Sequence, residues 1–312
     1  MDPALTGPLD DAAIALPDGY SKGLVYTIDV ITPIVDDPRV FGAIAAANAI
    51  SDVYAMGGTP QIALSFVGFP TDKLPLSMLG EVMIGMQACA AKAGCAIVGG
   101  HTIADGEPKA GLAVIGNIDR NRIWSHKNAR AGDMLLLSKA IGTGIVGQSV
   151  RAGRADDDLI GRAAAQMMQL NQSAMEAGLE AGAHACTDVT GFGLLGHLKH
   201  IVEASGLCAT INASDVPLIE GVLELAFSGL VPGGSKRNLQ YAEAITQFDS
   251  DVEDTLRLLL ADAQTSGGLL LCVPPEHARS CLEQLQKNGC DNAAIVGSLA
   301  QPDAAPQIKV IR

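Results

Sequence analysis

The chain has 312 residues, which corresponds to about two domains at roughly 150 residues each, and its net charge is −13. Apolar residues make up 48% and charged residues 18% of the sequence, a composition that excludes an intrinsically disordered chain. The acidic excess disfavours nucleic-acid binding, so we expect no DNA or RNA partner. The longest apolar stretches, such as residues 41–50, are too short to span a bilayer, and the N-terminus lacks the features of a signal peptide. We therefore expect a soluble, cytoplasmic protein.

The first part of the sequence predicts alternating strands and helices. Residues 23–34 are rich in Val, Ile, Tyr and Thr, which is typical of a strand. Residues 42–56 place small apolar residues at helical spacing, and a Gly-Gly pair ends this helix. The other predicted elements are a strand over 61–69, a helix over 76–93, and strands over 96–99 and 112–118. This order predicts one α/β domain, to which we assign residues 1–118.

The second part of the sequence also predicts a mixed α/β domain, which we place at residues 119–312. Residues 117–132 are polar and lack clear periodicity, so we expect them to connect the two domains. Predicted strands cover 133–138, 208–212, 268–273 and 293–299, and helical patterns cover 158–181, 194–204, 216–228 and 276–288.

The seven cysteines do not indicate a disulfide framework or a structural zinc site. Their number is odd, and no pair has the C-x-x-C spacing. Most lie in apolar helix or strand contexts, so we expect small buried hydrophobic side chains.

Two G-x-G-x-x-G motifs occur, at residues 142–147 and 191–196. A dinucleotide site requires a preceding strand and an acidic residue about 20 positions later. The first motif lacks that acid, and the second follows residues 187–190, a polar run unlike a buried strand. We therefore expect tight turns that enter helices. His197 and His200 follow the second motif without a third metal ligand, which favours positions on the helix surface over a zinc site.

Several aspartates stand in apolar or glycine-rich surroundings. Asp10 and Asp11 precede an apolar run, Asp29 lies within an apolar strand, Asp52 ends a helix segment of small residues, and Asp188 precedes a glycine-rich turn. A carboxylate in such a place is costly unless it is paired or bound to a metal. Each aspartate alone is also compatible with a helix cap or a solvated surface. Together they favour a joint site for Mg²⁺, which binds carboxylates and phosphate oxygens.

A second candidate binding element follows the predicted strand at 96–99. Gly99 and Gly100 precede His101 and Thr102, and glycines there would let backbone N–H groups approach an anion. The same residues are equally compatible with an ordinary tight turn.

Longer blocks of the sequence resemble those of the selenophosphate synthetase (selenide, water dikinase) family. They keep the family's order and extend from about residue 7 to the C-terminus. The blocks are residues 32–38, 45–58, 99–103 with 107–109, 187–197, 231–234 with 237–238, and 264–270.

This resemblance implies a fold of the aminoimidazole-ribonucleotide-synthetase type. Such proteins have two α/β domains and form homodimers in which the N-terminal domains build a shared β-barrel. The implied reaction converts ATP, selenide and water to selenophosphate, AMP and phosphate. It requires Mg²⁺, and members of the family are often stimulated by K⁺.

The resemblance also implies roles for individual residues. Metal binding is implied for Asp11, Asp52 and Asp188. Nucleotide binding is implied for Asp10, Asp29, Asn48, Gly100, His101 and Thr102. These assignments agree with the physical argument, because clustered carboxylates repel one another and an ATP polyphosphate brings divalent cations with it.

One departure concerns the family's N-terminal glycine-rich segment, which carries a reactive Cys or selenocysteine and an essential Lys. Here the first cysteine is Cys89 and the first lysine is Lys22, both after the Asp10-Asp11 pair, so neither matches. The catalytic residues stay unassigned. We expect an N-terminally truncated form that binds Mg²⁺–ATP weakly and makes little selenophosphate. An incorrectly assigned start or a naturally shortened relative would account for the same departure.

Two other functions remain open from the sequence. One is another ATP-dependent enzyme of the same superfamily, such as a thiamine-monophosphate kinase or a purine-pathway cyclase. The other is a non-catalytic nucleotide-binding dimer, which would bind ATP without turnover.

Overall fold

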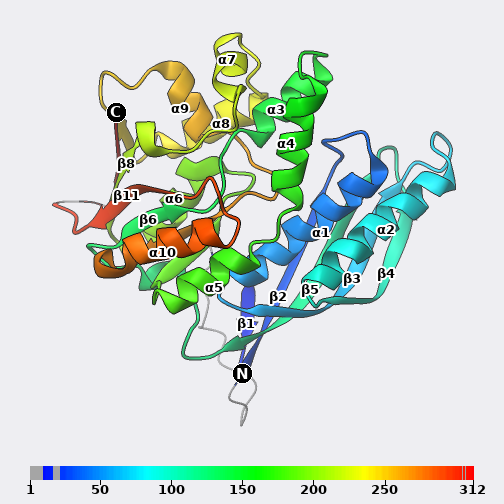
Figure 1. The fold of residues 1–312 in the computed structure, drawn as a ribbon, viewed down its shortest axis with the longest axis horizontal. Helices are drawn as coiled ribbons and strands as arrows, with labels where there is room; N and C mark the ends of the chain where they lie inside the picture. The colour runs from blue at the N-terminus through cyan, green and yellow to red at the C-terminus, as the bar shows by residue number, and fades with distance from the viewer. Residues whose placement is uncertain (1–9, 17–21, 304, 306) are drawn as a thin grey trace.

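The computed structural model describes residues 10–16, 22–303, 305 and 307–312. Its strands form two sheets, one built from the first part of the chain and one from the second (Figure 1). Both sheets are mixed, because each contains parallel and antiparallel neighbours. This arrangement confirms the predicted α/β fold with two parts, while the boundary at residues 118 and 119 stays a prediction.

The first sheet has the strand order β1-β2-β5-β3-β4. Its strands are β1 (Ala13–Ala15), β2 (Lys22–Ile31), β3 (Thr59–Phe69), β4 (Ala96–Ala104) and β5 (Lys109–Asp119). Strands β3 and β4 are parallel and are joined by helix α2, whereas the other neighbours are antiparallel. The order of elements follows the sequence prediction, with β1 added at the start.

Helices α1 (Pro38–Ala55) and α2 (Leu76–Lys92) lie side by side over one face of this sheet (Figure 1). Their backbones are in direct contact at two glycines. A Cβ added at Gly42 would lie 2.0 Å from the carbonyl oxygen of Val82, and one added at Gly85 would lie 1.9 Å from that of Arg39. The two glycines therefore set the distance between the helices.

Helix α1 begins four residues earlier than the predicted 42–56. The carboxylate of Asp37 accepts hydrogen bonds from the backbone N–H groups of Arg39 and Val40, at 2.8 and 3.0 Å. Pro38 occupies the first helical position, where its missing N–H is not needed. This cap-and-proline signal in the sequence marks the true start.

The opposite face of the first sheet carries exposed apolar side chains. Tyr26, Ile28, Leu64 and Val98 are 40%, 63%, 49% and 60% exposed. They line a hollow of about 440 Å³ on strands β2, β3, β4 and β5. No helix of the described residues covers this face, so helices bury only the opposite face of the sheet.

The second sheet has the order β7-β10-β6-β11-β8-β12-β9. Its strands are β6 (Met134–Leu137), β7 (Ala185–Asp188), β8 (Cys208–Asn212), β9 (Thr246–Phe248), β10 (Leu269–Val273), β11 (Ala294–Ala300) and β12 (Ile308–Ile311). The α-helices of this part are α3 (Thr143–Arg151), α4 (Asp157–Met168), α5 (Gln172–Glu180), α6 (Gly193–Ser205), α7 (Val222–Phe227), α8 (Gly233–Ala242), α9 (Asp254–Leu260) and α10 (Pro275–Lys287). Short 3-10 helices lie at His126–Asn128 and Ala213–Asp215.

Helices cover both faces of the second sheet. Leu135 and Leu137 of β6 belong to one buried cluster with Leu198 of α6, whereas Leu136 belongs to another cluster with Leu285 of α10. This alternation is the period-two pattern of a strand buried on both sides. The strand is therefore uniformly apolar in sequence.

The pattern over 158–181 forms two helices, α4 and α5, where one was predicted. Between them the carbonyl of Gln169 accepts a hydrogen bond from Lys139 Nζ at 2.7 Å. The amide of Asn171 donates to Ser51 Oγ and to the carbonyl of Gly267, both at 2.8 Å. These contacts with distant parts of the chain replace helical hydrogen bonds, which a local pattern does not reveal.

Two other predictions were wrong in detail. Residues 216–228 are helical in α7 alone, because Gly221 takes a left-handed conformation at φ +88° just before it. The polar run that includes Thr187 and Asp188 is not outside the sheet, since both residues end the buried strand β7. The short β9 and β12 and helices α8 and α9 were not predicted. Within the described residues, no helix is both long and apolar enough to cross a membrane.

Candidate functional site

A cavity of about 500 Å³ lies where the two parts of the chain meet. Residues from both parts line it, and most of them are polar. Its lining includes Asp10, Asp11, Asp29, Asn48, Asp52, Asp188, Thr190, Phe192, His197, His200, Gln264 and Thr265. The fold thus brings together all five aspartates that the sequence analysis selected, with Asn48.

Strand β2 and helix α1 position three of these side chains. Asn48 Nδ2 donates a 2.7 Å hydrogen bond to Asp29 Oδ2. Asp52 lies one turn further along α1 and accepts a hydrogen bond from the hydroxyl of Thr27. Because Thr27 and Asp29 alternate with outward-facing residues of β2, both point toward α1. The strand and the helix therefore present Asp29 and Asp52 to the same cavity.

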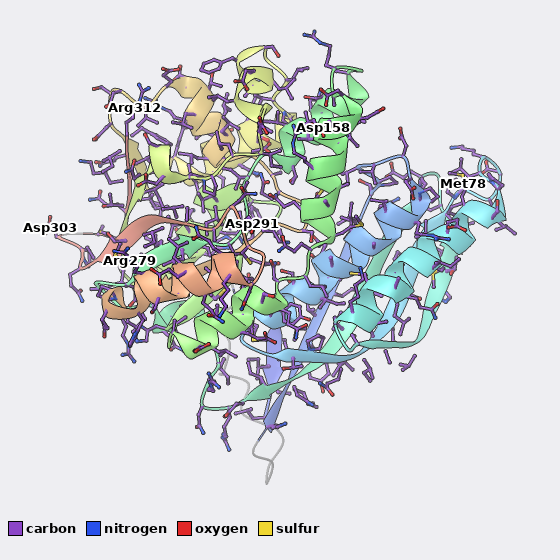
Figure 2. The ribbon with its side chains drawn as sticks, viewed as in Figure 1. Met78, Asp158, Arg279, Asp291, Asp303 and Arg312 are labelled. Atoms are coloured by element: carbon purple, nitrogen blue, oxygen red, sulfur yellow. The ribbon has the colours of Figure 1, made fainter. Side chains whose placement is uncertain are left out.

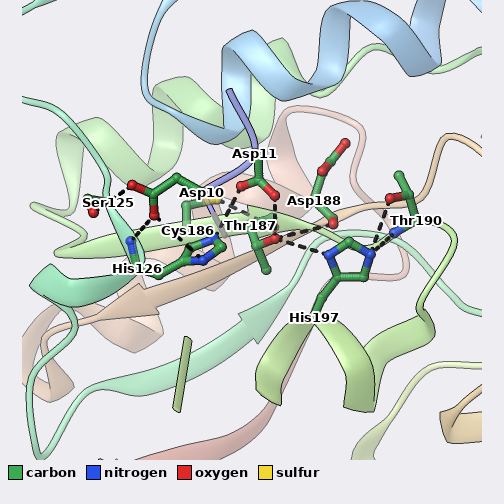
Figure 3. Close-up of polar contacts among 9 residues, drawn as sticks. All are labelled: Asp10, Asp11, Ser125, His126, Cys186, Thr187, Asp188, Thr190 and His197. Atoms are coloured by element: carbon green, nitrogen blue, oxygen red, sulfur yellow. Dashed lines mark hydrogen bonds and ion pairs between the residues drawn. The ribbon is translucent and has the colours of Figure 1, made fainter. Parts of the chain in front are cut away.

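The connecting segment and β7 hold the two aspartates that precede β1 (Figure 3). Asp10 accepts hydrogen bonds from Ser125 Oγ at 2.8 Å and from the backbone N–H of His126 at 2.9 Å. Asp11 accepts one from Thr187 Oγ1 at 2.8 Å, and its other oxygen lies 3.4 Å from His126 Nε2. Contacts from the second part of the chain thus orient both carboxylates.

Asp188 ends β7 and is 1% exposed. Its Oδ2 atom is buried and has no hydrogen-bond partner among the described residues. Burial, together with the negative charge of Asp11, raises the pKa of this carboxyl to about 8. A buried carboxylate oxygen without a partner is the kind of atom that a cation would satisfy.

Two other carboxyls of the cavity, those of Asp52 and Asp29, also have raised pKa values. Burial and the charges of Asp188 and Asp29 raise the pKa of Asp52 well above its usual range. Burial also raises the pKa of Asp29, opposed by the hydrogen bond from Asn48. Burial alone would lower the pKa of His126, but its contacts with Asp11 and Asp10 raise it. A bound cation would oppose these upward shifts, because it favours the ionised form of the carboxyls.

The oxygen-rich lining fits Mg²⁺ better than zinc. No group of three His, Cys, Asp or Glu side chains within the described part of the chain is arranged to hold a metal by itself. Mg²⁺ commonly takes one or two carboxylates and completes its shell with water and substrate phosphates. The residues present fit an ion of that kind, with a ligand supplying the missing oxygens.

Gly100, His101 and Thr102 do not form the turn that the sequence analysis predicted. They belong to β4, which continues to Ala104 and pairs with β3 along that length. All three are exposed at the edge of the first sheet and are not among the residues that line the cavity. Close packing accounts for Gly100, since an added Cβ would lie 2.1 Å from Ser65 Oγ.

The prediction of surface positions for His197 and His200 was also wrong. Their exposed fractions are 6% and 7%, and both line the cavity. A signal was present in the sequence, because His197 lies three residues after Leu194 and four before Ile201. Helical spacing places these three residues on one buried face of α6.

The first glycine motif begins a helix, as predicted, and its N–H groups are already bonded. Gln264 Oε1 accepts hydrogen bonds from the backbone N–H groups of Gly142 and Thr143, at 2.8 and 3.0 Å. Asp262 accepts from those of Gly144 and Ile145. Internal side chains thus satisfy the donors that a phosphate would need.

Some residues that shape the site were not found from the sequence. Lys139 is 3% exposed, and its ammonium donates to the carbonyls of Gln169 and Ser266, at 2.7 and 2.9 Å. Burial lowers its pKa to about 8. Ser266 in turn donates its backbone N–H to Asn48 Oδ1 at 2.8 Å. A positive φ of 48° at Ser266 marks the bend that makes this contact.

The cysteines are buried, as expected, except for the half-buried Cys208. None of the seven is among the residues that line the cavity. Cys186 is the cysteine beside Thr187 in β7, and burial raises its pKa well above the usual range. The described cysteines therefore offer no thiolate to this site.

Comparisons with known proteins identify the family. The model of the AIR synthase related protein N-terminal domain matches residues 9–118, and that of the C-terminal domain matches residues 130–305. A selenide, water dikinase from Pelobacter propionicus is 45% identical over 89% of this chain and 80% of its own length. The chain belongs to the selenide, water dikinase family.

Other members of this family match over similar lengths. The selenide, water dikinase of Myxococcus xanthus is 44% identical over 93% of this chain and 82% of its own length. The selenide, water dikinase of Clostridioides difficile is 38% identical over 93% of this chain and 83% of its own length. The resemblance found in the sequence motifs is thereby confirmed.

Solved structures of more distant proteins share the fold. The hydrogenase maturation protein HypE in complex with ATP has a TM-score of 0.70 and 24% identity, over 99% of this chain and 87% of that one. Thiamine-monophosphate kinase from Stenotrophomonas maltophilia has a TM-score of 0.70 and 19% identity, over 99% and 91%. At these identities the likeness shows the fold alone.

Proposed function

We propose that this protein makes selenophosphate from ATP, selenide and water, with AMP and phosphate as the other products. The observation that carries this proposal is the convergence of five aspartates from both parts of the chain on one cavity. Relatives that are 38–45% identical over about nine-tenths of the chain are named for the same activity. In this reaction the acidic cavity would bind the cations together with the polyphosphate of ATP.

In this proposal Asp11, Asp52 and Asp188 bind Mg²⁺, while Asp10, Asp29 and Asn48 contact the nucleotide. Bound Mg²⁺ would neutralise phosphate charge, the main requirement of phosphoryl transfer. The protein's own part is positioning. Ser125 and His126 hold Asp10 in place through hydrogen bonds. The hydrogen bond between Asn48 and Asp29 holds both of these side chains in the lining of the cavity. Stimulation by K⁺, which the family resemblance adds, belongs to the same proposal.

We also propose a homodimer that forms through the exposed apolar face of the first sheet. Ile28, Leu64 and Val98 lie on this face, and a second copy would bury them without new elements. The resemblance assigns Gly100, His101 and Thr102 to ATP, yet in one chain they lie outside the cavity. A second copy that pairs near β4 would make this assignment compatible with their position, if β4 of one copy then lay beside the cavity of the other. A shared barrel of the two first sheets is the arrangement that the resemblance implies.

For the 312-residue chain alone we propose low activity. The described cysteines do not line the cavity, and residues 1–9 lie outside the described part and contain neither Cys nor Lys. Selenide chemistry that depends on a thiolate or selenolate would therefore be slow. Mg²⁺–ATP binding would be weak but would persist, because Asp10, Asp29 and Asn48 are present.

The test is an anaerobic assay with ATP, Mg²⁺ and selenide, followed by ³¹P nuclear magnetic resonance. We expect a small, selenide-dependent selenophosphate signal together with AMP. A yield close to that of a family member with the N-terminal Cys and Lys would contradict the low-activity part. ATP consumption that needs thiamine monophosphate and ignores selenide would contradict the proposal itself. ATP binding without turnover, even after a family-type N-terminal segment is added, would favour the non-catalytic alternative.

A further inference from the structure

His197 is a buried imidazole whose two ring nitrogens both have partners within the site (Figure 3). Nε2 lies 3.1 Å from the backbone nitrogen of Thr190 and 3.2 Å from its hydroxyl oxygen. Nδ1 lies 3.3 Å from Thr187 Oγ1. The ring therefore bridges the turn after β7 and the strand itself.

These contacts determine which nitrogen carries the proton. A backbone N–H can only donate, so Nε2 must accept the hydrogen bond from Thr190 and is unprotonated. A neutral imidazole then carries its hydrogen on Nδ1, which points at Thr187 Oγ1. Burial, which lowers the pKa of His197 to about 4, agrees with a neutral ring.

The hydroxyl of Thr187 links His197 to Asp11 through two hydrogen bonds that run in the same direction. Its oxygen accepts from His197 Nδ1, and its single hydrogen is left to donate elsewhere. Asp11 Oδ1 lies 2.8 Å away, whereas the carbonyl oxygen of Asp188 lies 3.4 Å away. The shorter contact and the negative charge of the carboxylate both favour donation to Asp11.

Asp11 depends on this contact for its orientation. Its second oxygen has a longer contact, 3.4 Å, with His126 Nε2. The strand that follows Asp11, β1, has three residues and one neighbouring strand, so local backbone pairing holds the residue weakly. The hydroxyl of Thr187, itself fully buried, is the firmest anchor of this carboxylate.

We propose that His197 is a positioning residue, which orients the Asp11 carboxylate through the hydroxyl of Thr187 and so sets the affinity of the site for Mg²⁺. This inference rests on the proposed function, in which Asp11 binds the metal. His197 is not itself a metal ligand in this arrangement, because both of its nitrogens are engaged. Outer partners that orient metal ligands are worth about 10–100-fold in metal affinity.

The experiment measures the Mg²⁺ concentration that gives half of the full ATP binding, by calorimetric titration of the whole chain. We expect His197→Leu and Thr187→Val each to raise that concentration about 10–100-fold. The double variant should lose no more than the worse single variant, because both act through one chain of hydrogen bonds. ATP binding in the presence of EDTA should stay as in the wild type.

Two conservative variants separate positioning from structural damage. Thr187→Ser retains the hydroxyl, and His197→Asn retains an amide N–H near the place of Nδ1, so both should keep the midpoint within about threefold of wild type. His184→Leu is the matched control, since His184 is a half-buried histidine that contacts Asp133 outside the cavity. It should leave the Mg²⁺ midpoint unchanged.

The outcomes distinguish the two claims. A wild-type chain that shows no Mg²⁺-dependent ATP binding would overturn the proposed function and this inference with it. Wild-type binding that responds to Mg²⁺, with an unchanged midpoint in Thr187→Val, would overturn the inference alone. If His197→Leu does not fold, the nearly isosteric Thr187→Val still decides. Equal losses in Thr187→Ser and Thr187→Val would also contradict a role for the hydroxyl.

Discussion

Asp52 and Asp188 are buried carboxyls whose surroundings disfavour their negative charge. Burial is the largest cause for both, and the charges of neighbouring aspartates add to it. Such an arrangement lowers the stability of the metal-free protein, because ionising these groups in the folded state is costly. A bound divalent cation would lower the cost of ionising these carboxyls, since it attracts their negative charges. Under the proposed function, Mg²⁺ binding would offset this loss of stability.

The first prediction concerns Asp52→Asn. The variant keeps the shape of the side chain and removes its charge, so Mg²⁺-dependent ATP binding should fall at least tenfold, as for loss of one charged ligand. The thermal stability of the metal-free protein should not fall, because like charges are relieved. Calorimetric titration and thermal unfolding measure these two effects. Asp158→Asn is the control, since Asp158 projects outward from α4 (Figure 2), and unchanged binding in Asp52→Asn would refute the metal assignment.

The second prediction concerns pH. The folded-state pKa of Asp188, about 8, lies above its ordinary value of 3.8, so the folded chain holds a proton that the unfolded chain releases. This contribution to stability is fully present below pH 4 and is lost as the pH rises toward 8. Mg²⁺ affinity should rise over the same interval, because binding needs the ionised carboxyl.

Unfolding curves between pH 5 and 9, with and without Mg²⁺, test this prediction. Metal-free wild-type protein should lose stability relative to Asp188→Asn as the pH rises, and saturating Mg²⁺ should reduce the difference between high and low pH. Identical pH profiles for the two metal-free proteins would show that Asp188 ionises normally.

At the scale of elements, the contact between α1 and α2 sets the position of Asn48 and Asp52. The third prediction is that Gly85→Ala destabilises the protein by about 1–3 kcal/mol, because its methyl group would meet the backbone of Arg39. Gly80→Ala, on the same helix with no atom within 4 Å of the added group, should instead stabilise by about 0.4–1 kcal/mol. Denaturant unfolding compares them. Equal effects would show that the helices are not in close contact.

The elements with clear local patterns could be predicted from the sequence. Strand-forming composition and helical spacing located β2, β3, α1 and α2, and their order predicted an α/β arrangement for the first part of the chain. The break between α4 and α5 could not be found, since it depends on contacts of Gln169 and Asn171 with residues far away in the chain. The prediction of a turn at Gly100 was wrong for a related reason. The glycine is required by the neighbouring strand, which a local pattern does not show.

The candidate site could be predicted in its aspartates and only partly in their surroundings. Asp29 stood out as a charge within an apolar strand, Asp52 beside small helical residues and Asp188 before a glycine-rich turn. The resemblance then implied a role for each of them. Residues such as Lys139 and Ser125 carry no such signal. Their roles arise from hydrogen bonds between segments that the fold brings together.

At the scale of the molecule, the two sheets differ in how they are covered. Helices pack on both faces of the second sheet, whereas the first sheet leaves one apolar face exposed. Exposed apolar residues gathered on one sheet face are typical of an interaction surface. The proposed dimer uses this face.

The fourth prediction tests that dimer. Ile28→Lys places a charge within the apolar face, so it should convert a dimer to a monomer in light scattering after size exclusion. Phe227→Lys, at a residue 57% exposed on α7, is the control and should leave the mass unchanged. A wild-type chain that is monomeric at all concentrations would contradict the dimer.

The central claim is that carboxylates from both parts of the chain form one metal–nucleotide site. Crystals grown with Mn²⁺ and a non-hydrolysable ATP analogue test it most directly, because manganese is located by its anomalous scattering. We predict manganese between Asp11, Asp52 and Asp188, with the analogue's phosphates completing its ligands. Manganese and nucleotide bound elsewhere, with these three carboxyls still lacking a cation, would contradict the account.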